Sequence, residues 1–377
     1  MAIDFTFPPD VEDARERMRA FVDGEVRPAE ESLTSSKGGR GEWRAELDRL
    51  RGLARELDLW MPHMPREWGG MGVGPTALAA VSAEAAKSMF GSYVINCYAP
   101  DEGNMHTLLH WGTDKQKETY LRPMCEGTLR SCFAMTEPDV AGSDPTLMQT
   151  RGELDGDEWV INGHKWFISG ARGASFAILL ARTEDNPEVP QAATSAFIVE
   201  LPDPGFEIVR DVQTMAGSHN HCEIRIKDLR VPDERRLGER GQGHRLGQYR
   251  LGPARLAHCM RWLGQIEIAL DMMVARSTER YSHGSYLSEK QGIQWLISES
   301  AIELYQAKLM VLHAAYRIEH QLPFVTEVSM AKHHVANTLW NVVDRAVQVH
   351  GALGYSKDSP LSDMLLQARW SRFADGA

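Results

Sequence analysis

The chain has 377 residues, of which 43% are hydrophobic and 25% are charged, and this suits a globular protein of two or three domains. Its 41 Lys and Arg against 52 Asp and Glu give a net charge of −11, which argues against nucleic acid or an anionic membrane as the main ligand. The N-terminus lacks a basic segment followed by a long apolar one, and no run of about 18 apolar residues occurs. We therefore expect a protein without a signal peptide or membrane span, located in the cytoplasm. The five scattered cysteines favour reduced thiols.

The first part of the chain has apolar residues at helical spacing, which predicts helices over 10–30, 42–58 and 75–90. A loop rich in Gly and Pro, 61–72, separates the last two helices. We expect residues 1–129 to form an α-helical domain that serves as a scaffold.

Over residues 130–238 the apolar pattern alternates, as in strands. The expected strands lie at 159–161, 165–168, 176–180, 196–199, 206–209 and 221–226. The pair Asn162-Gly163 predicts a hairpin with a type I′ turn, and Asp155-Gly156-Asp157 predicts another turn. Short strands with regular breaks predict a small β-barrel or sandwich.

Helical spacing returns after residue 243 and predicts three long amphipathic helices, at 254–280, 288–322 and 325–350. Because such helices must bury their apolar stripes against one another, we expect residues 239–377 to form a helical bundle.

Residues 133–145 begin as an apolar run and continue as a loop of turn formers, which exposes backbone N–H groups to a ligand. A planar polar ring such as a flavin suits this loop. Its run Met-Thr-Glu-Pro-x-x-Ala-Gly-Ser-Asp resembles the first signature of the acyl-CoA dehydrogenase family. The resemblance implies a mainly α fold with a central β domain: a helical domain, a β-barrel and a four-helix bundle. It implies FAD as the cofactor, contacted by Phe133, Met135, Thr136, Gly142 and Ser143.

Residues 161–170 resemble the family's second flavin-binding strand, where an aromatic residue and a hydroxyl line one face of the ring. By position these are Phe167 and Ser169, with Ile168 between them. The family usually has Trp at the first place, but Trp166 lies one step earlier and alternates to the other face. We therefore expect Phe167 to pack on the flavin, although an aromatic doublet in a strand is more often core packing.

Residues 280–291 are similar to the family's Arg-x-x-Phe-Gly-x-x-Leu-x-x-x-Gln. The resemblance implies that Arg280 and Gln291 reach the cofactor of the neighbouring subunit, where the planar fork of Arg suits a pyrophosphate. His283 replaces the usual Phe in the packing around the adenine half.

Residues 348–355 resemble the family's Gln-x-x-Gly-Gly-x-Gly segment. The resemblance implies that Gln348, Gly351 and Ala352 approach the same shared cofactor, with Ala352 in place of the second Gly. A helix C-cap is the alternative, and both roles are compatible. A shared cofactor site implies a homodimer or a homotetramer.

The catalytic base is assigned to Asp375, in a run that matches the Tyr-Glu-Gly-Thr tetrad of many relatives. Removal of an α-proton needs a carboxylate whose pKa is raised by burial. An ordinary solvated carboxylate near the chain end is the alternative. The runs Arg-Phe-Ala-Asp-Gly and Arg-Leu-Gly-Pro-x-Arg resemble the branch whose animal members are fused to a kinase-like domain. Relatives continue beyond the position of Ala377 with a final helix.

Three residues are assigned to substrate by the resemblance. Ser143 matches a serine that bonds both flavin and substrate, and Arg255 matches an Arg close to the base and the acyl-CoA. Gly252 stands where an Asp usually contacts the pantetheine arm.

The resemblance implies an acyl-CoA dehydrogenase that forms trans-2-enoyl-CoA in fatty-acid β-oxidation and passes electrons to an electron-transferring flavoprotein. A flavin oxidase of the nitroalkane-oxidase type and a non-catalytic homologue remain open. No metal site is expected: His106 and His110, and the pair His219-x-His221, lack supporting ligands and are assigned to structure.

Overall fold

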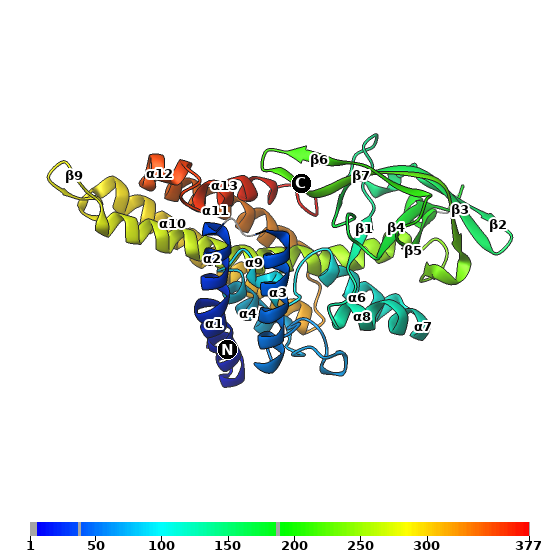
Figure 1. Ribbon diagram of the computed structural model, residues 1–377, viewed down its shortest axis with the longest axis horizontal. Helices are drawn as coiled ribbons and strands as arrows, with labels where there is room; N and C mark the ends of the chain where they lie inside the picture. Colours follow the sequence, from blue (N-terminus) through cyan, green and yellow to red (C-terminus); the bar gives the residue numbers. More distant parts are fainter. Residues whose placement is uncertain (1–5, 37–38, 186–188, 377) are drawn as a thin grey trace. The chain divides into compact units, whose positions relative to one another are not determined.

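The computed structural model describes residues 6–36, 39–185 and 189–376 (Figure 1). The chain divides into two compact units. The first comprises the residues up to Cys97 together with Arg255–Ala374, and the second comprises Tyr98–Ala254 with the residues from Asp375 onward. The division into three domains at 129 and 238 stays a prediction. Within the described ranges, no helix combines the length and the apolarity needed to cross a membrane.

The first unit begins with helices that confirm the three predicted from the apolar spacing. They are α1 (Pro9–Phe21), a π-helical turn (Val22–Val26), α2 (Arg27–Ser35), α3 (Arg40–Glu56), α4 (Pro75–Ala85) and the short α5 (Gly91–Val94). Both α1 and α4 start with Pro, which tolerates the first helical position because its missing N–H would have no partner there.

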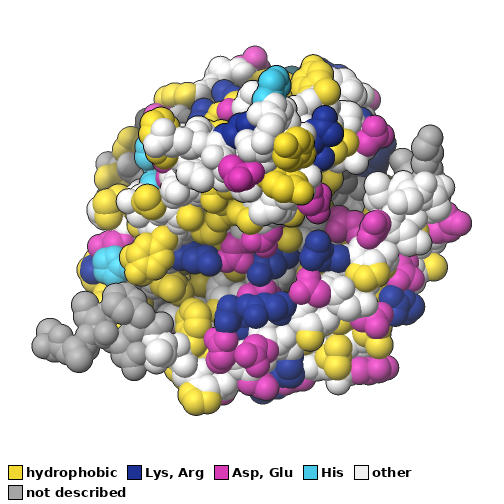
Figure 2. Space-filling view, turned by 90° about the vertical axis from the view of Figure 1, so that its left-hand side faces the viewer, with side chains coloured by type: hydrophobic (Ala, Val, Ile, Leu, Met, Phe, Trp, Pro, Cys, Tyr) yellow, Lys and Arg dark blue, Asp and Glu magenta, His cyan; other side chains and the backbone are white. Residues whose placement is uncertain are grey.

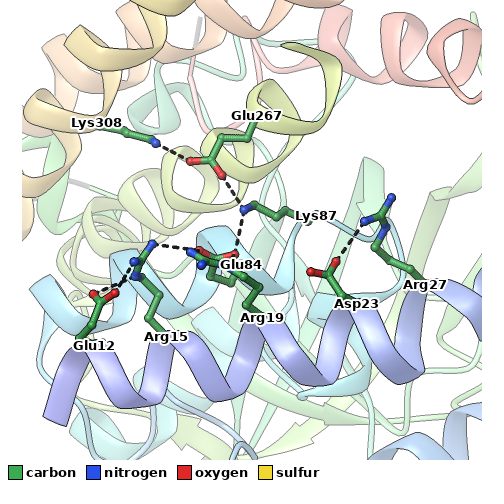
Figure 3. Close-up of polar contacts among 9 residues, drawn as sticks. All are labelled: Glu12, Arg15, Arg19, Asp23, Arg27, Glu84, Lys87, Glu267 and Lys308. Atoms are coloured by element: carbon green, nitrogen blue, oxygen red, sulfur yellow. Dashed lines mark hydrogen bonds and ion pairs between the residues drawn. The ribbon is translucent and has the colours of Figure 1, made fainter. Parts of the chain in front are cut away.

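An ion-pair network joins four helices of the first unit (Figure 3). Glu84, 3% exposed, accepts a hydrogen bond from Arg19 of α1 at 2.7 Å and pairs with Lys87 at 2.9 Å. Lys87 also pairs with Glu267 of α9 at 2.8 Å, and Glu267 pairs with Lys308 of α10 at 2.6 Å. Burial raises the pKa of Glu84, but the hydrogen bonds from Arg19 and Lys87 outweigh burial and lower it below its usual value.

The bundle helices of the first unit enclose a large apolar core. They are the part of α9 (Gly243–Glu279) from Arg255 onward, α10 (Gln291–Glu319), α11 (Val325–His350), the short α12 (Ala352–Tyr355) and α13 (Leu361–Trp370). Core residues include Ile266, Val311, Leu339 and Val343. A two-stranded hairpin of β9 (Tyr281–Ser282) and β10 (Ser285–Tyr286) connects α9 to α10.

Helix α9 starts at Gly243, whereas the sequence predicted a start at residue 254. The helix contains Pro253. Because proline cannot donate the usual backbone hydrogen bond, its position in the sequence indicates one end of a helix. Residues 249–253, which lie before the predicted start, are part of the helix.

The second unit combines the part of α9 up to Ala254 and three further α-helices with one eight-stranded sheet. The further helices are α6 (Asp101–Trp111), α7 (Asp114–Gln116) and α8 (Arg122–Cys125). The strands are β1 (Ser131–Ala134), β2 (Arg151–Asp155), β3 (Glu158–Ser169), β4 (Phe176–Arg182), β5 (Thr194–Glu200), β6 (Phe206–Thr214), β7 (Gly217–Pro232) and β8 (Arg236–Leu237). They follow the order β6-β7-β3-β2-β4-β5-β8, and β1 pairs in parallel with β4.

The predicted hairpin at Asn162-Gly163 is wrong, because β3 runs without interruption through both residues. The register with β7 shifts between Ile161 and Gly163, which marks a bulge. A Cβ at Gly163 would lie 2.3 Å from the hydroxyl oxygen of Thr150, so glycine is needed here for close packing and not for a turn. The turn between β2 and β3 lies at Gly156, as predicted.

Candidate functional site

The first predicted flavin stretch leaves the sheet at the end of β1. The guanidinium of Arg250 lies 4.1 Å from the ring centroid of Phe133. Gly142 and Ser143 are exposed on the loop that follows. A Cβ at Gly142 would lie 3.1 Å from the methyl carbon of Thr136, so glycine lets the loop fold closely over that threonine.

The two predicted flavin stretches are bonded directly to each other. The backbone N–H of Trp166 donates to the backbone carbonyl of Thr136 at 3.0 Å. The ammonium of Lys165, which is 0% exposed, donates to the carbonyl of Met135 and to the carboxylate of Glu137, each at 2.9 Å. These bonds fix the loop after β1 against the middle of β3.

The ion pair of Lys165 and Glu137 is buried, and both charged groups make further hydrogen bonds. Glu137 also accepts the N–H groups of Gln149 and Thr150, at 2.7 and 2.8 Å. Burial raises the pKa of Glu137, but the charge of Lys165 and these hydrogen bonds outweigh it and lower the pKa below its usual value. The carboxylate is therefore ionised in the folded protein and holds the loop as an anion.

Strand alternation breaks where the predicted ring-packing residue lies. The register with β7 shifts between Lys165 and Ile168, and both of these side chains are buried. Trp166 and Phe167 lie between them, with ring centroids 4.8 Å apart, and Phe167 is 38% exposed with a φ of 54°. The expectation that Trp166 alternates to the other face fails because the bulge interrupts the two-residue period. The role of Phe167 at a flavin stays a prediction.

The hydroxyl of Ser169 has a neighbour that sequence reasoning assigned to structure. His221 is directly paired with Ser169 across β3 and β7, and its Nδ1 lies 2.7 Å from the serine Oγ. The His221 ring centroid lies 5.7 Å from that of Phe167. No sequence signal gives this pairing, because it depends on the register of two strands about 50 residues apart. The side chain of His219 lies outside the described residues.

The predicted base, Asp375, belongs to the same unit as these strands. Burial lowers the pKa of Arg250, and among the carboxylates that oppose this effect Asp375 contributes most. The two side chains therefore lie within electrostatic reach of each other. Arg250 also donates to Asn104 Oδ1 at 2.9 Å and to the carbonyl of Pro100 at 3.4 Å. Arg250 opens the run Arg-Leu-Gly-Pro-x-Arg, but sequence reasoning assigned it no role, since its burial beside Phe133 follows from tertiary packing alone.

The predicted substrate residues lie on different elements. Ser143 lies on the exposed loop described above, and Gly252 and Arg255 lie three positions apart on α9.

The predicted contacts to a neighbouring subunit lie in the first unit, on exposed positions. His283 has a φ of 52° at the hairpin turn, and its Nδ1 lies 2.7 Å from the Ser282 Oγ. Gly351, with a φ of 64°, ends α11, so the helix-cap role is confirmed. In Figure 1 the hairpin and α12 lie toward the same end of this unit. The six exposed positions are Arg280, His283, Gln291, Gln348, Gly351 and Ala352.

Large exposed apolar side chains occur on the same elements. Tyr281 is 60% exposed, Trp295 61%, Tyr305 62% and Tyr355 83%. Figure 2, which views the molecule from the side of the hairpin, shows apolar groups interspersed with charged ones. Side chains of this kind are typical of a surface that binds another protein.

Three family models match the chain in order. They describe the N-terminal domain of acyl-CoA dehydrogenase at residues 8–128, the middle domain at 132–229 and the C-terminal domain at 241–377.

Among similar curated proteins, Acyl-CoA dehydrogenase family member 11 of Gallus gallus is 35% identical over 96% of this chain and 48% of its own length. Acyl-CoA dehydrogenase family member 10 of Mus musculus is 34% identical over 98% of this chain and 36% of its own length. This chain thus spans about half or less of those proteins. Probable acyl-CoA dehydrogenase FadE2 of Mycobacterium tuberculosis is 35% identical over 99% of this chain and 94% of its own length.

Solved structures share the fold. A provisionally assigned acyl-CoA dehydrogenase from Mycobacterium abscessus has a TM-score of 0.93 and 34% identity, covering 99% of this chain and 96% of its own. Butyryl-CoA dehydrogenase from Megasphaera elsdenii has a TM-score of 0.84 and 25% identity, covering 100% and 96%. These matches confirm the predicted fold class, and the chain belongs to the acyl-CoA dehydrogenase family.

Proposed function

We propose that this protein is an FAD-dependent acyl-CoA dehydrogenase that converts an acyl-CoA thioester to trans-2-enoyl-CoA. The observation that carries the proposal is the direct bonding of the two predicted flavin stretches, Trp166 to Thr136 and Lys165 to Met135 and Glu137. This bonding holds the exposed ring of Phe167 and the loop hydroxyls in one unit.

The residues present fit a flavin. Phe167 offers an exposed apolar ring at a bulge, and a flavin has a large planar face that packs on such a ring. The hydroxyls of Thr136, Ser143 and Ser169 offer donors and acceptors to its polar edge. When bound, FAD would supply the hydride acceptor for the β-carbon of the substrate.

The acid–base chemistry is assigned to Asp375. Its carboxylate removes the α-proton while the hydride leaves the β-carbon, so the substrate loses one proton and one hydride and gains a double bond. Arg250 lies within electrostatic reach of this carboxylate, and an opposite charge nearby favours the ionised form that a base needs. Ser143, Gly252 and Arg255 are proposed to contact the acyl-CoA.

The proposal extends to the assembly and to the electron acceptor. Arg280, His283, Gln291 and the residues at the end of α11 would reach the FAD of a neighbouring subunit in a homodimer or homotetramer. Their exposure supports this arrangement. The acceptor is proposed to be an electron-transferring flavoprotein, and the pathway fatty-acid β-oxidation. A similar structure, 27% identical with a TM-score of 0.85, is described as an electron-transferring flavoprotein of Acidaminococcus fermentans studied for electron bifurcation.

The substrate class has support from a second neighbour. A glutaryl-coenzyme A dehydrogenase, whose structure was solved as a complex with glutaryl-CoA, is 26% identical to this chain, with a TM-score of 0.85. That protein binds a CoA thioester on the same fold. The acyl group of the substrate of this protein depends on which side chains line its own site.

The test uses protein loaded with FAD and the variant Asp375→Asn. We expect the variant to stay yellow and to lose reduction of its flavin by acyl-CoA, because an amide cannot take the α-proton. Asp358→Asn, at an exposed position of the first unit, is the matched control and should be reduced like the wild type. Reduction of Asp375→Asn at the normal rate would show that the base is another residue. Turnover of nitroalkanes with oxygen would favour an oxidase instead.

A further inference from the structure

We propose that His221 is a positioning residue, which sets the direction of the Ser169 hydroxyl toward the cofactor and thereby tunes the cofactor's reduction potential. The inference rests on the proposed FAD site. It goes beyond that proposal because the resemblance gives no role to a histidine at this position.

The geometry places His221 on the outer face of the sheet, next to the predicted flavin residues. In the register of β3 and β7, Ile168 pairs with Cys222 and Ser169 pairs with His221. Ile168 and Cys222 belong to the buried core of the sheet. Because successive side chains of a strand point to opposite faces, Ser169 and His221 point away from that core.

The contact between the two side chains is short and direct. Ser169 Oγ and His221 Nδ1 lie 2.7 Å apart, the usual length of a good hydrogen bond to a hydroxyl. The ring of His221 also lies against Phe167, with centroids 5.7 Å apart and planes tilted by 39°. One imidazole therefore contacts both residues that β3 is predicted to present to the flavin.

The hydrogen bond controls what Ser169 can offer to a ligand. A serine hydroxyl has a single hydrogen, and a neutral imidazole can donate or accept at Nδ1, depending on its tautomer. When Nδ1 carries the hydrogen, Ser169 accepts from His221 and its own hydrogen is available outward. When Nδ1 has none, Ser169 donates to His221 and presents a lone pair outward.

These two arrangements match the two redox states of a flavin. The oxidised ring has nitrogens that accept hydrogen bonds, and one of them becomes an N–H donor after reduction. Ser169 can serve both states if His221 changes tautomer, releasing one ring hydrogen to water and taking one up at its other nitrogen. Because the two tautomers differ in free energy, one redox state is served more favourably than the other, and this difference shifts the reduction potential. No net proton is gained or lost by the side chains, and both residues are partly exposed.

The test compares the midpoint potential of bound FAD in the wild type, His221→Phe, His221→Asn and Ser169→Ala. Phe keeps the ring beside Phe167 but removes the nitrogen, whereas Asn returns an amide near the position of Nδ1. We expect His221→Phe to change the ratio of reduced to oxidised flavin at a fixed potential by about three- to tenfold, the effect of one hydrogen bond. His221→Asn should restore most of the wild-type ratio of reduced to oxidised flavin. In the double variant with Ser169→Ala, His221→Phe should add nothing further.

Each result has a definite meaning. A wild-type potential in His221→Phe, or effects of Ser169 and His221 that add fully, would overturn the inference and leave the proposed function standing. Wild-type protein that stays colourless with FAD would overturn both. If His221→Phe does not fold, the test uses ¹⁵N NMR of the wild-type protein. The signal of His221 Nδ1 should then move when the flavin is reduced, and an unchanged signal would contradict the inference.

Discussion

The buried pair of Lys165 and Glu137 provides the sharpest structural prediction. Replacing Lys165 with Met removes the ammonium but keeps an unbranched apolar chain in its place. Glu137 then remains as a buried anion, because its side chain is 4% exposed. Breaking a buried ion pair on one side costs about 3–5 kcal/mol, and the bond to the Met135 carbonyl is lost as well. We expect the variant to unfold at lower denaturant and to bind FAD more weakly.

The assay is a double-mutant cycle by denaturant titration of the protein without FAD. Glu137→Gln together with Lys165→Met removes both charges and should recover most of the loss, since no unpaired charge remains. The control is Lys115→Met, which breaks a pair with Glu234 of similar length, 3.0 Å against 2.9 Å, whose side chains are 77% and 64% exposed. An exposed pair contributes little, so the control should unfold like the wild type. Equal behaviour of the Lys165 and Lys115 variants would refute the reasoning.

Three further predictions concern charge and packing. Because the pKa of Glu84 is lowered in the folded state, its ion pairs stabilise the protein above the unfolded pKa and cease to do so as pH falls through the folded value; Glu84→Gln should flatten the acid limb of a stability–pH curve. Arg250→Met should raise the pKa of Asp375 and move the onset of flavin reduction by acyl-CoA to higher pH, and an unchanged profile would contradict the pairing. Gly163→Ala should destabilise the protein by about 1–3 kcal/mol through overpacking against Thr150, which thermal unfolding would detect. A variant as stable as the wild type would show that the bulge can move to make room for the added methyl group.

The parts of the fold that depend on local pattern could be predicted. Apolar spacing identifies α10 and α11 to within a few residues, because an amphipathic helix repeats its signal over many turns. The start of α9 could not be found, since Pro253 reads as a helix boundary and only the packed structure shows it inside the helix.

The parts that depend on long-range register could not be predicted. Asn162-Gly163 reads as a hairpin turn, yet the close approach of Thr150 explains the glycine and keeps β3 continuous. In the same way, His221 became a candidate only once the pairing with Ser169 was known. The motif resemblance located the candidate site; it did not reveal the side chains that fix its geometry.

Anaerobic absorbance spectroscopy of the FAD-loaded wild type tests the central claim most directly. A panel of acyl-CoAs of different chain length is added under argon while the flavin band is followed. We predict that at least one acyl-CoA bleaches the band and that 2-enoyl-CoA forms in equal amount. A band that persists with every acyl-CoA, in protein whose flavin dithionite readily reduces, would contradict the account.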